Sequence, residues 1–191
     1  IIAGQSWGGN VVLAFGAEHP ERARGLAFID GGFLNLHSEM PDWDVVAERL
    51  RPPQLTGIKP DFLRERIRIG HPDWSAQAVE SILGNFAVDS EGGLRANLTL
   101  ERHMLILRAL WEQEPASLFP RVSAPVLICP ASRHAPDDQA RAERMVTAAA
   151  ALLPRSRTEW FWDTDHDIHA QRPDALADVF LRELRTGLWS T

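Results

Sequence analysis

The sequence predicts an α/β fold in which short, mostly parallel strands are flanked by helices and a helical segment is inserted between two strands. Three observations support this prediction. Apolar runs such as residues 26–29 are of buried-strand type and alternate with stretches of helical spacing. The first apolar run leads through Gly-x-Ser-x-Gly, residues 4–8, directly into a helical pattern, so a serine lies at a tight strand-to-helix turn. From residue 33 to about residue 119, helical stretches punctuated by prolines replace the strands.

The composition limits the classes of function. The chain has 191 residues, of which 45% are apolar, and this suffices for one sizeable core. Its net charge of −6 is spread over interspersed acidic and basic residues, which argues against a nucleic-acid partner. No apolar run approaches the roughly 18 residues of a membrane span, so no membrane partner is expected. The single cysteine, Cys129, permits no intrachain disulfide and favours a cytoplasmic location.

The opening residues are the centre of the predicted fold. Gly4 and Gly8 lie two residues on either side of Ser6, and without a Cβ each is expected to let neighbouring backbone approach closely. The serine would then hold its hydroxyl outward in a strained conformation. The N–H of Trp7 opens the next helix, where free donors and the positive end of the helix dipole face an oxyanion. One turn thus offers a nucleophile and an oxyanion donor.

The next elements bring a carboxylate to the sheet edge. The first helix is expected from Gly9 to Glu18, because His19 precedes a proline and is biased away from helix. The strand at residues 26–29 ends at Asp30. Open α/β sheets build their sites at the carboxyl ends of their strands, so Asp30 is a candidate site residue.

The remaining elements follow from the same patterns. The inserted segment is expected to contain helices near residues 43–51, 61–69, 75–86 and 100–112, with a polar turn at residues 89–93. The core then returns with a strand at residues 124–130, a polar loop at 131–138, a helix at 139–153, a strand at 158–162, a loop at 163–171 and a helix at 173–187.

These motifs resemble the α/β-hydrolase superfamily over about half of the chain. The resemblance rests on Gly4-Gln5-Ser6-Trp7-Gly8, on the strand-like runs Leu26 to Asp30 and Pro125 to Pro130, and on the loop Asp165-His166-Asp167-Ile168-His169 ahead of Pro173. It implies the C-terminal part of a hydrolase sheet. Residues 1–32 and 120–191 would form the hydrolase core, and residues 33–119 a helical cap that shapes the substrate pocket.

The resemblance also implies that the chain is truncated at its N-terminus. Most folds of this family place several strands, and the loop that gives the second oxyanion donor, before the nucleophile. A buried parallel strand at position 1 likewise needs neighbours on both sides. We therefore expect roughly a third of the protein to precede residue 1, and the chain alone to lack part of the catalytic machinery.

Ser6 is the expected nucleophile, and a serine hydroxyl needs a base to take its proton. Of the seven histidines, His166 precedes Pro173 by seven residues, the spacing that the family shows for its catalytic histidine. His169 is the alternative base, and its other role would be to support the loop by hydrogen bonding. Trp7 would supply the oxyanion donor through its backbone N–H.

The acid that partners the histidine is less closely defined by the sequence. In most members of the family it follows the strand at residues 126–129, at about the position of His134, so this sequence departs from the pattern. Asp30, at the end of the previous strand, is the preferred acid because strand ends are rigid. Asp137 and Asp138, in the polar loop, remain the alternatives.

No cofactor or metal is expected. Gly4, Ser6 and Gly9 miss the Gly-x-Gly-x-x-Gly spacing of a dinucleotide site. His166 and His169 lack the His-Glu-x-x-His pattern that places two ligands and a base on one helix face.

The expected function is a serine hydrolase that cleaves an ester-like or related carbonyl substrate through an acyl-enzyme. The aromatic residues near the turn and in the cap predict an apolar pocket for a small molecule: Trp7, Phe33, Trp43 and Trp74. Alternatives on the same fold are a cofactor-free haloperoxidase, a proline-releasing peptidase and a C–C bond hydrolase. The alternative outside catalysis is a ligand-binding protein. The sequence leaves the substrate and the oligomeric state open.

Overall fold

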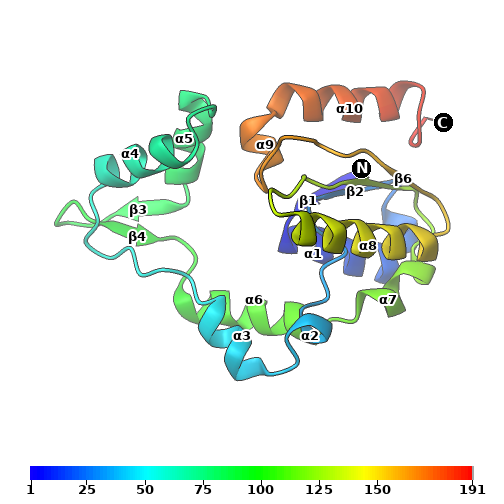
Figure 1. Cartoon of the computed structure of the whole chain (residues 1–191), viewed down its shortest axis with the longest axis horizontal. Helices are drawn as coiled ribbons and strands as arrows, with labels where there is room; N and C mark the ends of the chain where they lie inside the picture. Colours follow the sequence, from blue (N-terminus) through cyan, green and yellow to red (C-terminus); the bar gives the residue numbers. More distant parts are fainter. Residues whose placement is uncertain (191) are drawn as a thin grey trace. The chain divides into compact units, whose positions relative to one another are not determined.

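The computed structural model describes residues 1–190, which form two compact units, residues 1–36 with 113–190 and residues 37–112 (Figure 1). The second unit lies inside the segment predicted as a cap, residues 33–119. The flanks of that segment belong to the first unit because their aromatic side chains are buried in its core. Phe33 and Phe119 are both 4% exposed and pack with side chains of the sheet.

The first unit is built on a four-stranded parallel sheet, which confirms the predicted α/β fold. Its strands are β1 (Ile2–Gln5), β2 (Leu26–Ile29), β5 (Val126–Cys129) and β6 (Ser156–Thr158), in the spatial order β1-β2-β5-β6. The two central strands are buried at every residue, as expected where both faces of a parallel sheet are covered.

The register of the sheet sets where the functional edge lies. Gln5 pairs with Ile29, and Ile29 pairs with Cys129, so three neighbouring strands end level with one another. The residues that follow the first two strands, Ser6 and Asp30, therefore emerge from adjacent strand ends at the same carboxyl edge.

Helices cover both faces of this sheet. The helices of the first unit are α1 (Trp7–Glu18), α7 (Pro115–Leu118), α8 (Pro136–Leu152), α9 (Ile168–Gln171) and α10 (Pro173–Arg185), with 3-10 turns η1 (Pro20–Arg22) and η2 (Phe119–Arg121). Alternate strand residues point to opposite faces. Leu26 and Phe28 pack with α1 and α8, whereas Ala27 and Ile29 pack with α9 and α10. Figure 1 shows the sheet nearly edge-on, with α10 above it and α1 and α8 below.

A buried acid fixes the segment after α10. The Glu183 carboxylate is fully buried, accepts two hydrogen bonds of 2.8 Å from Arg157, and accepts one of 2.7 Å from the Leu188 N–H. Burial alone would raise the pKa of Glu183, but the Leu188 N–H and the two arginines, Arg157 and Arg182, hold it below its usual value. The same turn lets the Trp189 indole donate to a backbone carbonyl at the amino end of β5.

The second unit contains helices and one hairpin. Its elements are α2 (Leu36–Glu39), α3 (Trp43–Arg49), α4 (Pro60–Gly70), α5 (Ala76–Leu83), β3 (Phe86–Val88), β4 (Leu94–Ala96) and α6 (Leu100–Glu112), with α2 starting at the boundary. Ser75 accepts from the Ala78 N–H and begins α5, as a helix cap does. The guanidinium of Arg108 lies over the rings of Trp43 and Trp111, which joins α3 to α6.

Aromatic residues expected to line a pocket serve as packing groups within these units. Phe33 belongs to the core of the sheet, and the Trp43 ring lies 5.7 Å from that of Trp111. Trp74 is 9% exposed and stacks on His71 with ring centroids 4.1 Å apart. Trp7, in contrast, is 42% exposed.

Several elements differ from the sequence predictions. The helix predicted at residues 75–86 ends at Leu83, and Phe86 is already the first residue of β3. The hairpin of β3 and β4 was not predicted, because its three-residue strands give too short an apolar signal, although the turn at residues 89–93 lies where it was expected. The strand predicted at 158–162 begins at Ser156, since an edge strand with one neighbour tolerates polar residues; its pairing continues irregularly through Phe161 N–H to Pro130 O at 2.9 Å. Helix α8 begins three residues early, at Pro136, where proline suits the first helical turn.

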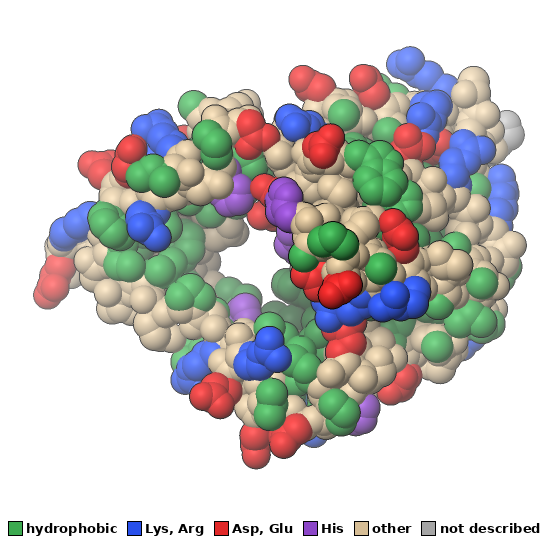
Figure 2. Space-filling view, in the orientation of Figure 1, with side chains coloured by type: hydrophobic (Ala, Val, Ile, Leu, Met, Phe, Trp, Pro, Cys, Tyr) green, Lys and Arg blue, Asp and Glu red, His purple; other side chains and the backbone are tan. Residues whose placement is uncertain are grey.

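The surface carries no single-signed charge patch on the face that Figure 2 shows, where acidic and basic side chains are interspersed. Across residues 1–190, every helix is too short or too polar to cross a bilayer.

The Glu183 contacts generate a stability prediction. We expect Glu183→Ala to lower the free energy of unfolding by about 3 kcal/mol, because it leaves a buried N–H and two arginines without their shared acceptor. Asp178→Ala, on the exposed side of the same helix, is the matched control and should change it by less than about 0.5 kcal/mol. Urea denaturation of both variants measures the difference, and equal effects would contradict the anchoring role of Glu183.

Candidate active site

Ser6 lies in a strained turn between β1 and α1. Its backbone angles are φ 55° and ψ −128°, a region that residues with a Cβ rarely adopt. Two hydrogen bonds hold it there, from Ser6 N–H to Ile29 O and from Gly9 N–H to Ser6 O, both 2.9 Å long. The strained conformation is thus fixed on one side by the neighbouring strand and on the other by the start of α1.

Glycines allow this turn to pack against neighbouring backbone. A Cβ placed on Gly4 would lie 2.2 Å from Gly8 O, and one on Gly31 would lie 1.9 Å from Ser6 O. The expectation for Gly8 itself was wrong, because a Cβ there would meet no atom within 4 Å among the described residues. The close approach on that side belongs to Gly9, whose Cβ would lie 2.5 Å from Gly32 N.

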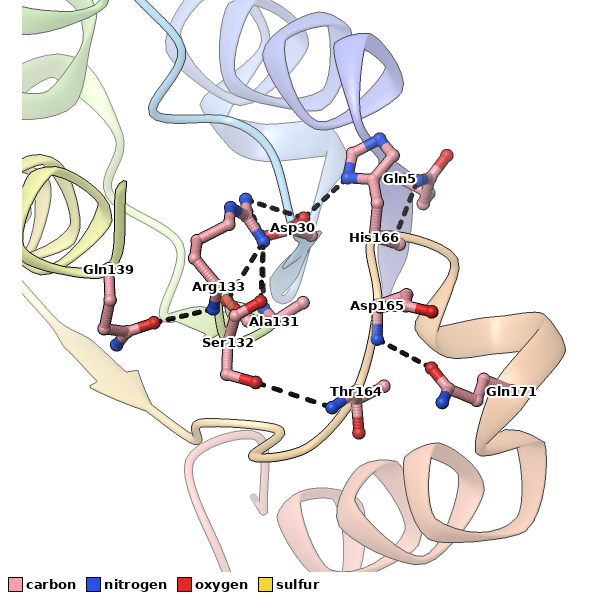
Figure 3. A network of polar contacts seen from close by, with 10 residues as sticks. All are labelled: Gln5, Asp30, Ala131, Ser132, Arg133, Gln139, Thr164, Asp165, His166 and Gln171. Atoms are coloured by element: carbon pink, nitrogen blue, oxygen red, sulfur yellow. Dashed lines mark hydrogen bonds and ion pairs between the residues drawn. The ribbon is translucent and has the colours of Figure 1, made fainter. Parts of the chain in front are cut away.

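Asp30 is a buried carboxylate at the end of β2. It is 1% exposed, its φ is 42°, and its N–H donates to Cys129 O at 2.8 Å. The carboxylate accepts from Ala131 N–H at 3.0 Å and from Arg133 Nη2 at 3.0 and 2.9 Å. His166 Nδ1 lies 2.6 Å from Oδ2 of the same carboxylate. Figure 3 shows these groups converging on Asp30 from the loop after β5 and from the loop before α9.

These partners determine the ionisation of Asp30. Burial alone would raise the pKa of Asp30, but the hydrogen bonds from His166 and Arg133, the positive charge of Arg133 and the Ala131 N–H together hold it below its ordinary value. An ionised carboxylate only accepts hydrogen bonds, so Nδ1 of His166 carries the proton in this contact. In the neutral ring, Nε2 is then the free acceptor.

The loop that carries His166 is held from three directions. Gln5 Nε2 donates to His166 O at 3.3 Å, which ties the loop to the residue before Ser6. Asp165 N–H donates to Gln171 Oε1 at 2.6 Å, so the start of the loop is fixed to α9. Thr164 N–H lies 3.5 Å from the Ser132 hydroxyl. The His166 side chain is 47% exposed at this edge.

The structure brings together Asp30 and His166, and the sheet register brings Ser6 to the adjacent strand end. Within residues 1–190 the Ser6 hydroxyl makes no hydrogen bond. The His166 ring contacts Asp30 and not this hydroxyl. Trp7 begins α1, so its N–H is among the first-turn donors that no carbonyl within the helix can satisfy.

The alternative site residues lie elsewhere. Asp137 and Asp138 are exposed in the first turn of α8 rather than in a loop, and it is Asp30 that contacts His166. His169 is exposed on α9. His134, at the position where the family resemblance implied the acid, lies with Nε2 3.0 Å from Asp165 Oδ1. In the described part of the chain, no three His, Cys, Asp or Glu side chains are grouped to hold a metal ion.

Sequence reasoning missed Arg133 and Gln5. Arg133 follows β5 as Asp30 follows β2, so the argument that parallel strand ends share one edge applies to it equally. A basic residue beside a predicted acid was a usable signal. Gln5 gave none, because its contact with the backbone of His166 spans 161 positions in the sequence.

Comparisons with known proteins agree with the fold. The sequence profile described as "Alpha/beta hydrolase family" matches residues 1–179. No curated protein matches the chain. Among solved structures, E-2-(acetamidomethylene)succinate hydrolase is 18% identical with a TM-score of 0.72, and covers 95% of this chain. The peroxisomal alpha-beta-hydrolase Lpx1 from Saccharomyces cerevisiae is 12% identical with a TM-score of 0.71, and covers 100%.

A thermophilic esterase from Thermogutta terrifontis is 22% identical with a TM-score of 0.63, and covers 98% of this chain. The chain itself spans 65%, 53% and 65% of the lengths of these three proteins, respectively. At these identities the likeness concerns the fold.

Gly4 and Gly8 provide a matched pair for testing the turn. We expect Gly4→Ala to lower the free energy of unfolding by about 2 kcal/mol or more, because its Cβ would meet the Gly8 carbonyl and force the turn apart. Gly8→Ala, in open space at the start of α1, should be neutral or stabilising by up to about 1 kcal/mol. Chemical denaturation of the two variants measures this contrast, and a reversed order would refute the described packing.

The lowered pKa of Asp30 predicts an acid dependence. We expect Asp30→Asn, which tolerates a positive φ, to be less stable than the wild type by about 2 kcal/mol near neutral pH. The contribution of the carboxylate is fully present above its ordinary pKa of 3.8 and is lost as the pH falls through the lower folded-state value. Urea denaturation over this acid range should show the two proteins converging below pH 3.8, and a constant gap would contradict the described contacts.

Proposed function

The chain belongs to the alpha/beta hydrolase family, and from this premise we propose that it carries the catalytic groups of a serine hydrolase. In this proposal Ser6 is the nucleophile, His166 the general acid and base, and Asp30 the partner of the imidazole. The observation that carries it is the 2.6 Å contact between Asp30 and His166 at the sheet edge where the strained Ser6 turn begins.

The first half-reaction forms an acyl-enzyme. The Ser6 hydroxyl attacks the carbonyl carbon of an ester-like substrate while Nε2 of His166 accepts its proton. The ionised, buried Asp30 carboxylate accepts a hydrogen bond from Nδ1–H of His166 and stabilises the imidazolium that forms. The imidazolium then gives its proton to the leaving oxygen, and the bond between that oxygen and the acyl carbon breaks.

The second half-reaction releases the acyl group. A water molecule loses a proton to Nε2 of His166 as its oxygen attacks the acyl carbon, and the Ser6 oxygen leaves with a proton from the imidazolium. In both halves the carbonyl oxygen becomes negative. The Trp7 N–H, at the start of α1, is the proposed donor to this oxyanion.

Two further features favour serine chemistry on an apolar substrate. Burial raises the pKa of the only cysteine, Cys129, to about 12, so this thiol is a poor competitor as a nucleophile. Its free state is compatible with the reducing cytoplasm that we propose as the location. Trp7 is 42% exposed directly after the proposed nucleophile, and such a surface suits an apolar acyl group.

The test is active-site labelling of the full-length protein that carries this chain. We expect a fluorophosphonate to label Ser6 and a short-chain p-nitrophenyl ester to be hydrolysed. Ser6→Ala should abolish labelling, and Asp30→Asn should reduce kcat by about a thousandfold or more, because the imidazole loses the acceptor that fixes its tautomer.

Ser190→Ala is the matched control, since it changes an exposed serine near the end of the same unit and should leave both readouts unaltered. Labelling that persists in Ser6→Ala would refute the proposed nucleophile. A folded protein with neither labelling nor ester hydrolysis would instead favour a ligand-binding role.

A further inference from the structure

We propose that Arg133 is a positioning residue for the imidazole. It holds the Asp30 carboxylate in place for His166, and its positive charge offsets part of the negative charge of that carboxylate. The kinetic consequence of this inference rests on the proposed function. The contacts that carry it involve only residues of this chain.

Both terminal nitrogens of the Arg133 guanidinium, Nη1 and Nη2, make hydrogen bonds. Nη1 donates to Ala131 O at 3.1 Å and to Ser132 O at 3.3 Å, so the side chain folds back over its own loop. Nη2 lies 3.0 Å from Asp30 Oδ1 and 2.9 Å from Oδ2. The backbone N–H of Arg133 donates to Gln139 Oε1 at 2.8 Å, which attaches the loop to α8 (Figure 3). These contacts fix the position of the Arg133 guanidinium, and with it the position of its positive charge.

The two oxygens of Asp30 have different partners. Oδ1 accepts from the Ala131 N–H and from Arg133, whereas Oδ2 accepts from Arg133 and from His166 Nδ1. The guanidinium and the imidazole thus share one oxygen, with contacts of 2.9 and 2.6 Å to it. The carboxylate cannot rotate without breaking a contact on each side, so Arg133 and the Ala131 N–H together set its orientation toward the ring.

This shared oxygen also has an electrostatic consequence. A carboxylate alone would stabilise a protonated imidazole strongly, whereas a permanently charged guanidinium on the same oxygen opposes that stabilisation. The Arg133 side chain is only 29% exposed, so solvent screens this opposition incompletely. Arg133 therefore offsets part of the negative charge that the Asp30 carboxylate presents to the imidazole.

Other charged groups near the ring do not replace this effect. Asp165 and Asp167 flank His166 in the loop, and the carboxylate of Asp165 faces His134 at 3.0 Å. Gln5, which reaches the loop from β1, is uncharged. Arg133 is the cation that contacts Asp30 in the described residues, and it lies in the loop that follows β5.

The test is an NMR titration of the His166 ring in the full-length protein, with its signal assigned by His166→Gln. We expect Arg133→Gln to raise the titration midpoint of His166 by about one pH unit, because the opposing charge is gone. Arg133→Lys keeps a cation and should stay within about 0.3 unit of the wild type. Arg144→Gln removes a charge from an exposed position on α8 and is the matched control, with no shift expected.

Folding of each variant is checked by circular dichroism. A folded Arg133→Gln with an unchanged or lowered midpoint would overturn the inference, and so would a rise of one unit in Arg133→Lys, which tests the charge independently. In an active protein, the acid limb of the kcat/KM profile should move with the midpoint. The titration needs no substrate. A shifted His166 midpoint in a protein without ester hydrolysis would therefore contradict only the proposed function. Ester hydrolysis with an unshifted midpoint would contradict only this inference.

Discussion

The level ending of three parallel strands is the constraint on which the rest of the structure depends. Pairing of Gln5 with Ile29 and of Ile29 with Cys129 places the ends of three strands side by side. Because the hydrogen-bonded ladder is buried under helices on both faces, these ends cannot slide relative to one another. A serine turn, a carboxylate and a basic loop consequently meet without a dedicated scaffold of their own.

The buried carboxylate of Asp30 joins three segments of the chain through its hydrogen bonds. Its desolvation is opposed by a backbone N–H, a guanidinium and an imidazole, each from a loop with its own supports. Removing any one partner leaves the others with a less well-compensated charge, so these loops are coupled through a single side chain. Glu183 is stabilised by the same kinds of contact, and its partners fix the turn after α10 instead of an imidazole ring.

Much of this organisation could be predicted from the sequence, because it depends on local patterns. The strand-turn-helix around Ser6 and the buried runs of β2 and β5 are contiguous signals, and the family resemblance predicted His166 through its spacing to Pro173. Arg133 was missed although it follows the end of β5 at the edge where Asp30 lies, because the pairing itself spans 103 positions in the sequence. The start of β6 was missed for a different reason: an edge strand can be polar, so apolar periodicity does not define it.

The separation between Asp30 and His166 has a consequence for how the chain folds. The turn at Ser6 and the strand that follows form from residues close together in the sequence, whereas the contact between carboxylate and imidazole closes a loop of 136 positions that includes an entire second unit. Such distant contacts are entropically costly and form late. A nascent chain would therefore expose the Ser6 turn long before the imidazole of His166 could dock on the Asp30 carboxylate.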